Sequence, residues 1–277
     1  MTTISAMVIA DSVGLEAPRL TTMLLRYPLV IHAELMTHRV FSRNAASSRA
    51  IPIQKMIKAT LDDPFIPLVW TKNQPGMQGY TELSPSEAEA AKNVWVGALT
   101  EAVRFTRRLD NMNVHKQIAN RLLAPFAHIT VVVSSTQWSN WFALRDHPKA
   151  EPHIRLLAQK MHAALEASKP TTLFPGEWHL PFVGERDRQR ALMGHPEPIR
   201  LSVARCASTS YKTVDDFDMT QDRADKLFEG LLGEMPVHAS PAEHQAKIVA
   251  DVMDQGLNGN FGEGWVQFRK TIKGECQ

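Results

Sequence analysis

The chain has 277 residues, of which 44% are hydrophobic and 22% are charged, and its formal net charge is +2. These values exclude a disordered chain and a strongly basic protein that grips nucleic acid through its overall charge. Two cysteines, Cys206 and Cys276, are too few for a disulfide scaffold or a cysteine-rich zinc module. Because no apolar run is long enough to cross a bilayer and no secretory signal is visible, we expect a cytoplasmic protein that binds neither nucleic acid nor membrane.

The first elements of the chain alternate apolar runs with polar segments. Residues 20–27 (LTTMLLRY) predict a strand, and residues 29–37 (LVIHAELMT) fit either a short helix or a buried strand. A polar loop is expected over 42–48. Pro52 then suits the first turn of a helix that covers residues 51–61.

The middle of the chain predicts a long loop followed by helices and one strong strand. The loop covers residues 62–84, which are rich in Pro, Gly and Asn. Ser84 begins a long helix over residues 86–108, and a shorter helix is expected over 115–123. Residues 126–135 (FAHITVVVSS) are rich in Val, Ile and Thr and predict a strand.

The second half of the chain is mostly helical, with a Pro- and Gly-containing connector over residues 170–198. Strands and helices are mixed without strict alternation, so we expect an α+β fold in which helices pack on a mixed sheet. We expect one domain over residues 1–277, with the connector as the candidate sub-boundary. The remaining expected elements are helices over 150–168, 200–208, 221–232 and 241–253, and a strand over 265–270.

The first candidate site is the segment 37–49 (THRVFSRNAASSR). If Pro52 opens a helix, Ser47, Ser48 and Arg49 lie just before the positive end of that helix. Backbone N–H groups, two hydroxyls and a guanidinium would together form a phosphate site. A solvated polar loop is the alternative from composition alone.

A second candidate follows the strand over 126–135. Two Trp and one Phe of the segment 137–145 (QWSNWFALR) could wall a planar ring, and Asn140 and Arg145 could project from a short helix. A core helix with one exposed arginine is the alternative. Arg121, in IANRLLAP, is either an anion-binding group or a surface charge.

The segment 238–244 (HASPAEH) is the last candidate. Ser240 could cap a helix from Pro241, with Glu243 completing a capping box, and that structural role needs no catalysis. The 11 histidines show no metal-binding spacing, so no metal site is expected. Walker A, GxGxxG and GxSxG motifs are absent from the sequence.

Together these fragments resemble the flavin-dependent thymidylate synthases, which are marked by Arg-His-Arg, seven residues and then Ser. His38-Arg39 and Ser47 reproduce that spacing, with Thr37 in place of the first Arg. Asn120-Arg121-Leu-Leu-Ala-Pro is similar to the family's Ala-Arg-x-x-Leu-Pro. Residues 140–145 and 150–154 are similar to its Asn-Phe-x-x-Leu-Arg and Ala-Gln-x-Glu-Ile segments.

The order of two other matching segments is unusual. Residues 204–211 (ARCASTSY) and 238–244 resemble pieces that family members carry near the N-terminus, ahead of the Arg-His-Arg segment. Here they follow it, which indicates a circularly permuted and divergent member. Permutation is tolerated where chain termini lie close together at the surface.

The resemblance implies transfer of a one-carbon unit from methylenetetrahydrofolate to C5 of a pyrimidine deoxynucleotide, most simply dUMP to dTMP. FAD, recharged by NADPH, would supply hydride, in a homotetramer whose sites are shared between subunits. Arg145 would also stabilise the anionic pyrimidine. The implied nucleotide-binding residues are Glu34, Ser47, Ser48, Arg49, Arg121 and Arg145. The implied FAD-binding residues are His38, Arg39, Asn140, Ser210, His238, Ser240 and Glu243.

Three departures from the family pattern leave the product open. Thr37 removes a charge, Ala45 replaces an acidic residue, and Glu34 replaces a Gln and, if ionised, can only accept hydrogen bonds. Hydroxymethylation of dUMP and C5 alkylation of a cytosine nucleotide are therefore alternatives. A non-catalytic flavin- or nucleotide-binding protein is the alternative from another class, and the retained anion-binding arginines argue against it.

Overall fold

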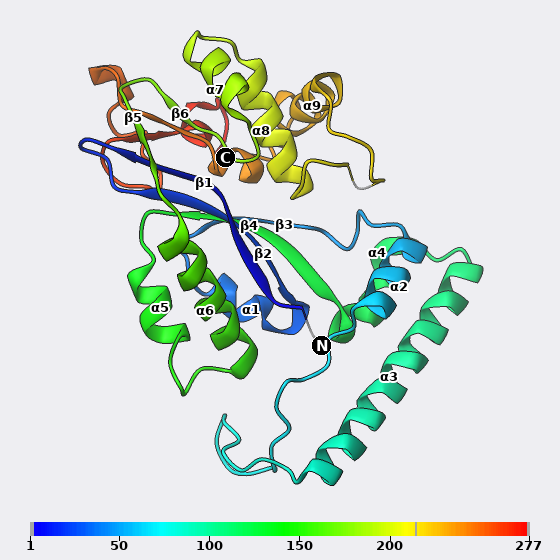
Figure 1. The fold of residues 1–277 in the computed structure, drawn as a ribbon. Coiled ribbons are helices and arrows are strands. Elements are labelled where there is room, and N and C mark those ends of the chain that lie inside the picture. Colours follow the sequence, from blue (N-terminus) through cyan, green and yellow to red (C-terminus); the bar gives the residue numbers. More distant parts are fainter. Residues whose placement is uncertain (1–2, 214, 276–277) are drawn as a thin grey trace.

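A computed structural model describes residues 3–213 and 215–275 and shows the α+β fold expected from the sequence (Figure 1). The larger sheet has the order β3-β4-β2-β1-β5 and the smaller one β6-β7-β8. The larger sheet is mixed, because β1 and β5 are parallel while its other neighbours are antiparallel. The strands are β1 Ser5–Gly14, β2 Leu20–Pro28, β3 Ser42–Ala45, β4 His128–Ser135, β5 Thr171–Leu173, β6 Trp178–His179, β7 Ala246–Ile248 and β8 Trp265–Gln267.

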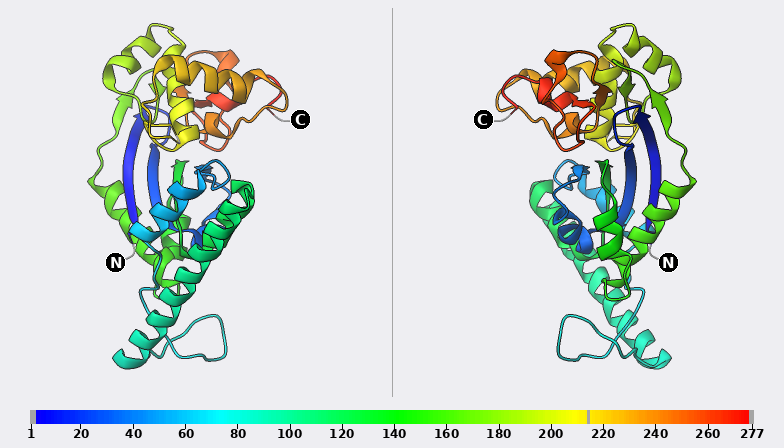
Figure 2. Two further views of the ribbon diagram at one scale, coloured as in Figure 1. Left: turned by 90° about the vertical axis from the view of Figure 1, so that its right-hand side faces the viewer. Right: turned by 90° about the vertical axis from the view of Figure 1, so that its left-hand side faces the viewer.

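The helices surround the larger sheet and extend to both ends of the molecule (Figures 1 and 2). The α-helices are α1 His32–Met36, α2 Ile53–Asp62, α3 Pro85–Asn111, α4 Lys116–Ala119, α5 Ser139–Arg145, α6 Pro152–Ala167, α7 Glu185–Leu192, α8 Glu197–Ser208 and α9 Gln221–Phe228. The short helices are η1 Leu29–Ile31, η2 Asn120–Phe126, η3 Glu229–Gly233, η4 Ser240–Glu243, η5 Val252–Asp254 and η6 Phe268–Thr271. Among the described residues, no helix is both long and apolar enough to cross a membrane.

Alternate residues of the central strands face two different cores, as the two-residue period of a strand requires. Val131 and Val133 of β4 pack with α6 residues such as Leu157 in the main core. Val132 faces the opposite way and packs with Phe182 and the buried Cys206. The C-terminal part of the chain therefore covers the face of the sheet that α6 leaves open (Figure 1).

Helix α3 extends away from the sheet, and its C-terminal half packs with α2 and η2 (Figure 2). It begins with the capping box that Ser84 and Glu87 predict. The segment before it, residues 62–84, is the expected long connection with one isolated bridge. Its start is held by hydrogen bonds from Trp95 Nε1 to the carbonyl of Phe65 and from the Leu68 N–H to His153 Nε2.

Three expectations about secondary structure are wrong, and one strand was not predicted. The loop expected over 42–48 contains β3, because its backbone pairs with β4 although its side chains are mostly polar. The connector over 170–198 contains β5, β6 and α7, and the first strand, β1, is not evident from the sequence pattern. The helix expected over 241–253 is replaced by η4, β7 and η5. Cys276 lies outside the described residues.

Candidate functional site

The polar turn before α2 forms a shallow cradle on the surface. Ser47, Ser48, Arg49 and Arg121 all line a hollow of about 410 Å³. Residues 47–50 form a turn in which the Ala50 N–H donates to the carbonyl of Ser47, 3.0 Å away. The sequence-based prediction of a polar cluster ahead of a helix is met, because α2 begins directly after Pro52.

The side chain of Asn120 fixes the backbone of this cradle. Its side chain is buried, and its Nδ2 donates to the carbonyls of Ser48 at 2.8 Å and Ile51 at 2.9 Å. Lys116 adds a hydrogen bond from Nζ to the carbonyl of Ala50 at 2.9 Å. Sequence reasoning did not assign Asn120 a role in the site, although its place beside Arg121 in a matched motif was a usable signal.

The cradle offers positive charge without a built-in counterion. Arg49 and Arg121 are exposed, and within residues 3–213 and 215–275 neither guanidinium is paired with a carboxylate. Among the described residues, Arg121 makes one hydrogen bond, from Nε to the carbonyl of Gln117 at 3.1 Å, which leaves its Nη donors for a ligand. With the N-terminal end of α2 nearby, the cradle has the chemistry of an anion site, and of phosphate above all.

A second group lies where the end of α1 meets the end of α5. Arg145 donates from Nη1 to Glu34 Oε2 at 2.9 Å and from Nε to His38 Nε2 at 3.1 Å. Its Nη2 lies 3.3 Å from the hydroxyl of Thr37. The structure thus joins three residues that the sequence assigned to nucleotide and flavin binding, and it adds Thr37.

His38 is the buried member of this group and is held as a neutral imidazole. Its ring stacks on Phe41 and meets the edge of Trp141, with ring centroids 5.8 and 4.8 Å away. Burial lowers the pKa of His38, and the charges of Arg145 and Arg43 lower it further. Because Nε2 accepts from Arg145, the ring proton lies on Nδ1.

The remaining expected FAD-binding residues lie in the C-terminal part of the chain. Ser210 follows α8, and its hydroxyl donates to the carbonyl of Lys212 at 2.8 Å. His238 and Ser240 are exposed, and the capping box expected at Ser240 does not form. Glu243 instead forms an ion pair with Arg269, whose guanidinium reaches it from the neighbouring η6.

Strand β3 connects these C-terminal residues to the second group. Arg43 donates from Nη1 to the carbonyls of Met36 at 2.8 Å and His38 at 3.1 Å. Burial raises the pKa of Glu243, while Arg269, Arg43 and a hydrogen bond with Ser42 act in the lowering direction. Arg43 therefore lies close to both the Arg145 group and Glu243. Sequence reasoning did not single out Arg43, because it could not be told apart from the other arginines of the same polar segment.

The segments that resemble displaced N-terminal pieces also lie against β3. Asn44 Nδ2 donates to the carbonyl of Cys206 in α8 at 2.7 Å. Gln267 Nε2 donates to Ser42 Oγ at 3.2 Å and to the carbonyl of Glu243 at 2.9 Å. The late segments are thus placed beside the strand that leads to the cradle.

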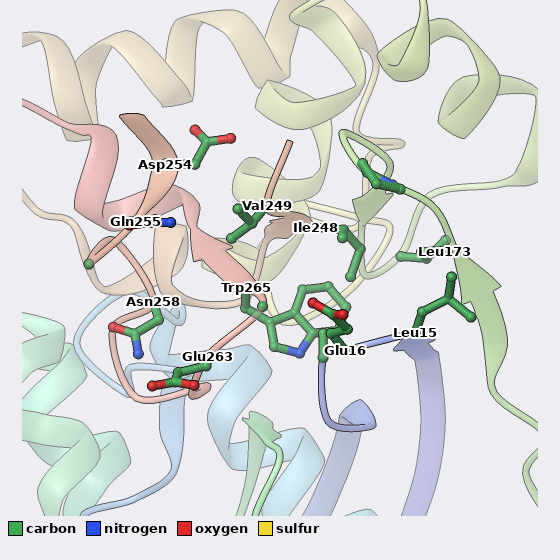
Figure 3. Close-up of a pocket in the computed structure, with 14 residues that line it drawn as sticks. Leu15, Glu16, Leu173, Ile248, Val249, Asp254, Gln255, Asn258, Glu263 and Trp265 are labelled. Carbon is green, nitrogen blue, oxygen red and sulfur yellow. The ribbon is translucent and has the colours of Figure 1, made fainter. Parts of the chain in front are cut away.

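A further cavity lies apart from these groups. A cavity of about 660 Å³ between the β1–β2 hairpin and the C-terminal sheet is lined by residues such as Glu16, Ile248, Glu263 and Trp265 (Figure 3). It contains none of the residues assigned from the sequence. Within the described part of the chain, no group of three or more His, Cys, Asp or Glu side chains is arranged to hold a metal ion.

Comparison with known families identifies the class of enzyme. The family described as thymidylate synthase complementing protein matches residues 13–171, which is more than half of the chain. The chain belongs to this family of methyltransferase-type enzymes. The match spans the cradle and the Arg145 group, and it ends before the C-terminal residues that were expected to bind FAD.

Comparison with solved structures supports the fold. A UMP/dUMP methylase, PolB from Streptomyces cacaoi, bound with 5-Br UMP, is 17% identical with a TM-score of 0.50, and the match covers 60% of this chain and 89% of that one. The structure of the same methylase with 5-Br dUMP gives 15% identity, a TM-score of 0.48, and coverage of 59% and 90%. A search of curated protein sequences finds no match.

Proposed function

We propose that this enzyme transfers a one-carbon unit from methylenetetrahydrofolate to C5 of a pyrimidine deoxynucleotide, in the simplest case converting dUMP to dTMP. FAD is the proposed cofactor, NADPH the proposed reductant, and a homotetramer the proposed assembly. The observation that carries the proposal is the cradle, because two serines and two arginines from separate parts of the chain converge on one hollow of about 410 Å³.

The cradle suits the phosphate of a nucleotide in both charge and support. Arg49 and Arg121 offer guanidinium donors, and Ser47 and Ser48 offer hydroxyls on the turn before α2. Asn120 fixes the backbone of that turn through two hydrogen bonds. Preformed donors bind an anion more tightly than mobile ones, because less side-chain and loop entropy is lost on binding.

The residues assigned to FAD have the donor groups that a dinucleotide needs. Arg39, Asn140, His238 and Ser240 are exposed, and among the described residues their side chains make no hydrogen bond. They fit a ligand with a charged pyrophosphate and polar rings. When bound, FAD supplies the hydride chemistry.

Arg145 is the proposed catalytic residue. Its guanidinium is permanently charged and is positioned by three partners on α1 and the residues that follow it. A fixed cation beside a pyrimidine stabilises negative charge that develops on the ring, and such preorganised groups contribute strongly to catalysis. His38 stays neutral beside it and adds no competing positive charge.

The first experiment is spectroscopic. The purified protein, as isolated or reconstituted with FAD, should show flavin absorbance that bleaches on addition of NADPH under anaerobic conditions. A protein that cannot be loaded with FAD contradicts the proposal.

The second experiment identifies the substrate. Product analysis should compare dUMP, UMP and dCMP, each with methylenetetrahydrofolate, and should distinguish methyl from hydroxymethyl products by mass. The variants R49Q and R121Q should raise the KM for the nucleotide at least tenfold. R107Q, which changes an exposed arginine on α3, is the matched control and should behave like the wild type. Equal KM values in all three variants would remove the cradle from the proposal.

A further inference from the structure

A continuous chain of buried polar side chains runs between the two sheets. His179 bonds through Nδ1 to Ser12 Oγ at 2.9 Å and through Nε2 to Thr22 Oγ1 at 2.8 Å. Thr22 Oγ1 lies 2.6 Å from Ser134 Oγ, which in turn lies 2.8 Å from His244 Nδ1. All five residues are buried. We refer to them as the Ser12–His244 chain.

The sheet geometry accounts for this alignment. Thr22 and Ser134 are directly opposite each other in the pairing of β2 with β4, so their side chains lie on the same face. Ser12 lies on the neighbouring strand β1. The two imidazoles come from the C-terminal part of the chain, His179 from β6 and His244 from the residue after η4.

The hydrogen bonds allow only two consistent proton arrangements. Each hydroxyl has one proton, so Thr22 and Ser134 each donate to one neighbour and accept from the other. Either His244 Nδ1 donates and every bond runs toward Ser12, or Ser12 donates and every bond runs toward His244. Both imidazoles carry their proton on Nδ1 in the first case and on Nε2 in the second. Opposite tautomers would leave a buried hydroxyl proton unpaired or the 2.6 Å contact without a proton.

The two ends of the chain have different surroundings. Ser12 lines a cavity of about 180 Å³, together with Glu185 and Arg188 of α7. At the other end, Nε2 of His244 is buried and has no hydrogen-bond partner within the described residues. His244 follows directly on Glu243, in the segment proposed to bind FAD.

Neither imidazole carries charge at neutral pH. Burial lowers the pKa of His179 and of His244 to about 3. The charge of Arg188 lowers the pKa of His179 further, and Asp11 acts in the raising direction. A proton therefore crosses such a chain by a shift of all its bonds together, without resting on an imidazolium.

We propose that the Ser12–His244 chain is a proton path from the cavity at Ser12 to the segment that binds the redox cofactor. In the arrangement in which every bond runs toward His244, one proton enters at Ser12 Oγ from water, each link passes its own proton onward, and one proton leaves from Nε2 of His244 to the bound cofactor. Every group regains its proton count, and the bonds then run toward Ser12 until the hydroxyls and imidazole rings turn back. Reduction of FAD consumes one proton (NADPH + FAD + H⁺ gives NADP⁺ + FADH₂), and the path supplies it. This use rests on the proposed function, whereas the path itself does not.

The test is carried out on the full-length protein without flavin, labelled with ¹⁵N-histidine. Nitrogen chemical shifts give each tautomer, and solvent exchange of the His244 ring N–H measures proton passage. We expect His179 and His244 to share one tautomer. Exchange at His244 should be at least tenfold slower in the variants T22V and S134A, which interrupt the path at different links.

Two controls separate proton passage from loosening of the fold. T22S keeps the hydroxyl, and T106V removes a buried hydroxyl of α3 that bonds only within its helix; both should exchange within twofold of the wild type. Backbone amide exchange in β2 and β4 should not rise in T22V. Opposite tautomers, or unchanged exchange in both T22V and S134A, would overturn the proposal. Because no flavin is present, this result is independent of whether the protein reduces FAD.

Discussion

Replacement of Arg145 by alanine tests whether its charge is used for catalysis or for folding. The change removes the donors to Glu34 and His38 and the contact with Thr37. The side chains of Arg145 and Glu34 are 21% and 39% exposed, so their ion pair is partly screened and contributes about 0.5 kcal/mol. The hydrogen bond to His38 adds about 1 kcal/mol.

The expected loss of unfolding free energy is therefore about 1–2 kcal/mol, or roughly 2–6 °C in Tm for a chain of this size. The expected loss of activity is larger, because removal of one preorganised charge-stabilising donor lowers kcat about 10²- to 10³-fold. Thermal melting and turnover with dUMP, measured on the same preparation, compare the two effects. Flavin absorbance should be retained.

The variant R145K is the matched control. Lysine keeps the charge but cannot make three hydrogen bonds in fixed directions, so kcat should be intermediate. Turnover of R145A within threefold of the wild type would refute the catalytic role of Arg145. A fall in Tm far beyond 6 °C would show instead that the group is mainly structural.

Three further predictions concern stability. N120A removes two hydrogen bonds to the cradle and should lower the unfolding free energy by about 2 kcal/mol in urea denaturation, while raising the nucleotide KM. Burial lowers the pKa of His128 to about 4 and of His179 and His244 to about 3, so the unfolded chain binds more protons below pH 6.5. The free energy of unfolding should be highest above that pH and should fall by about 1.4 kcal/mol per pH unit for each imidazole, down to the folded pKa of that imidazole. The slope against pH should be shallower in H128Q, and an unchanged slope in H128Q contradicts this prediction. S84A removes the cap of α3 and should cost about 1 kcal/mol in thermal or urea unfolding, and no measurable cost would show that the cap is dispensable.

The sequence predicts the elements whose signals are local. The strand at β4 follows from a run of Val, Ile and Thr, and the start of α3 follows from Ser84 and Glu87. The cradle follows because Ser47, Ser48 and Arg49 stand directly before a helix. Each of these signals lies within a few residues of the feature it predicts.

The sequence does not predict features that depend on distant partners. β3 is a strand because the backbone of Ser42–Ala45 pairs with β4, some 90 residues later. Its mostly polar side chains do not predict a strand. Glu243 has the spacing of a capping box, but its carboxylate is paired with Arg269, 26 residues later, and no side-chain cap forms. The support that Asn120 gives to the cradle is equally non-local, because its two acceptors lie about 70 residues earlier.

The pairing of Glu34 with Arg145 has a consequence for selectivity. The carboxylate already occupies one edge of the guanidinium, with Glu34 Oε2 2.9 Å from Arg145 Nη1. An anion that binds Arg145 must displace the carboxylate of Glu34. The net binding free energy is therefore only the difference between two similar contacts. Small anions such as chloride bind too weakly to displace the Glu34 carboxylate. A ligand that is already bound elsewhere on the protein competes with it at a high effective concentration. We therefore expect this site to favour a ligand that is also bound elsewhere on the protein over a free small anion.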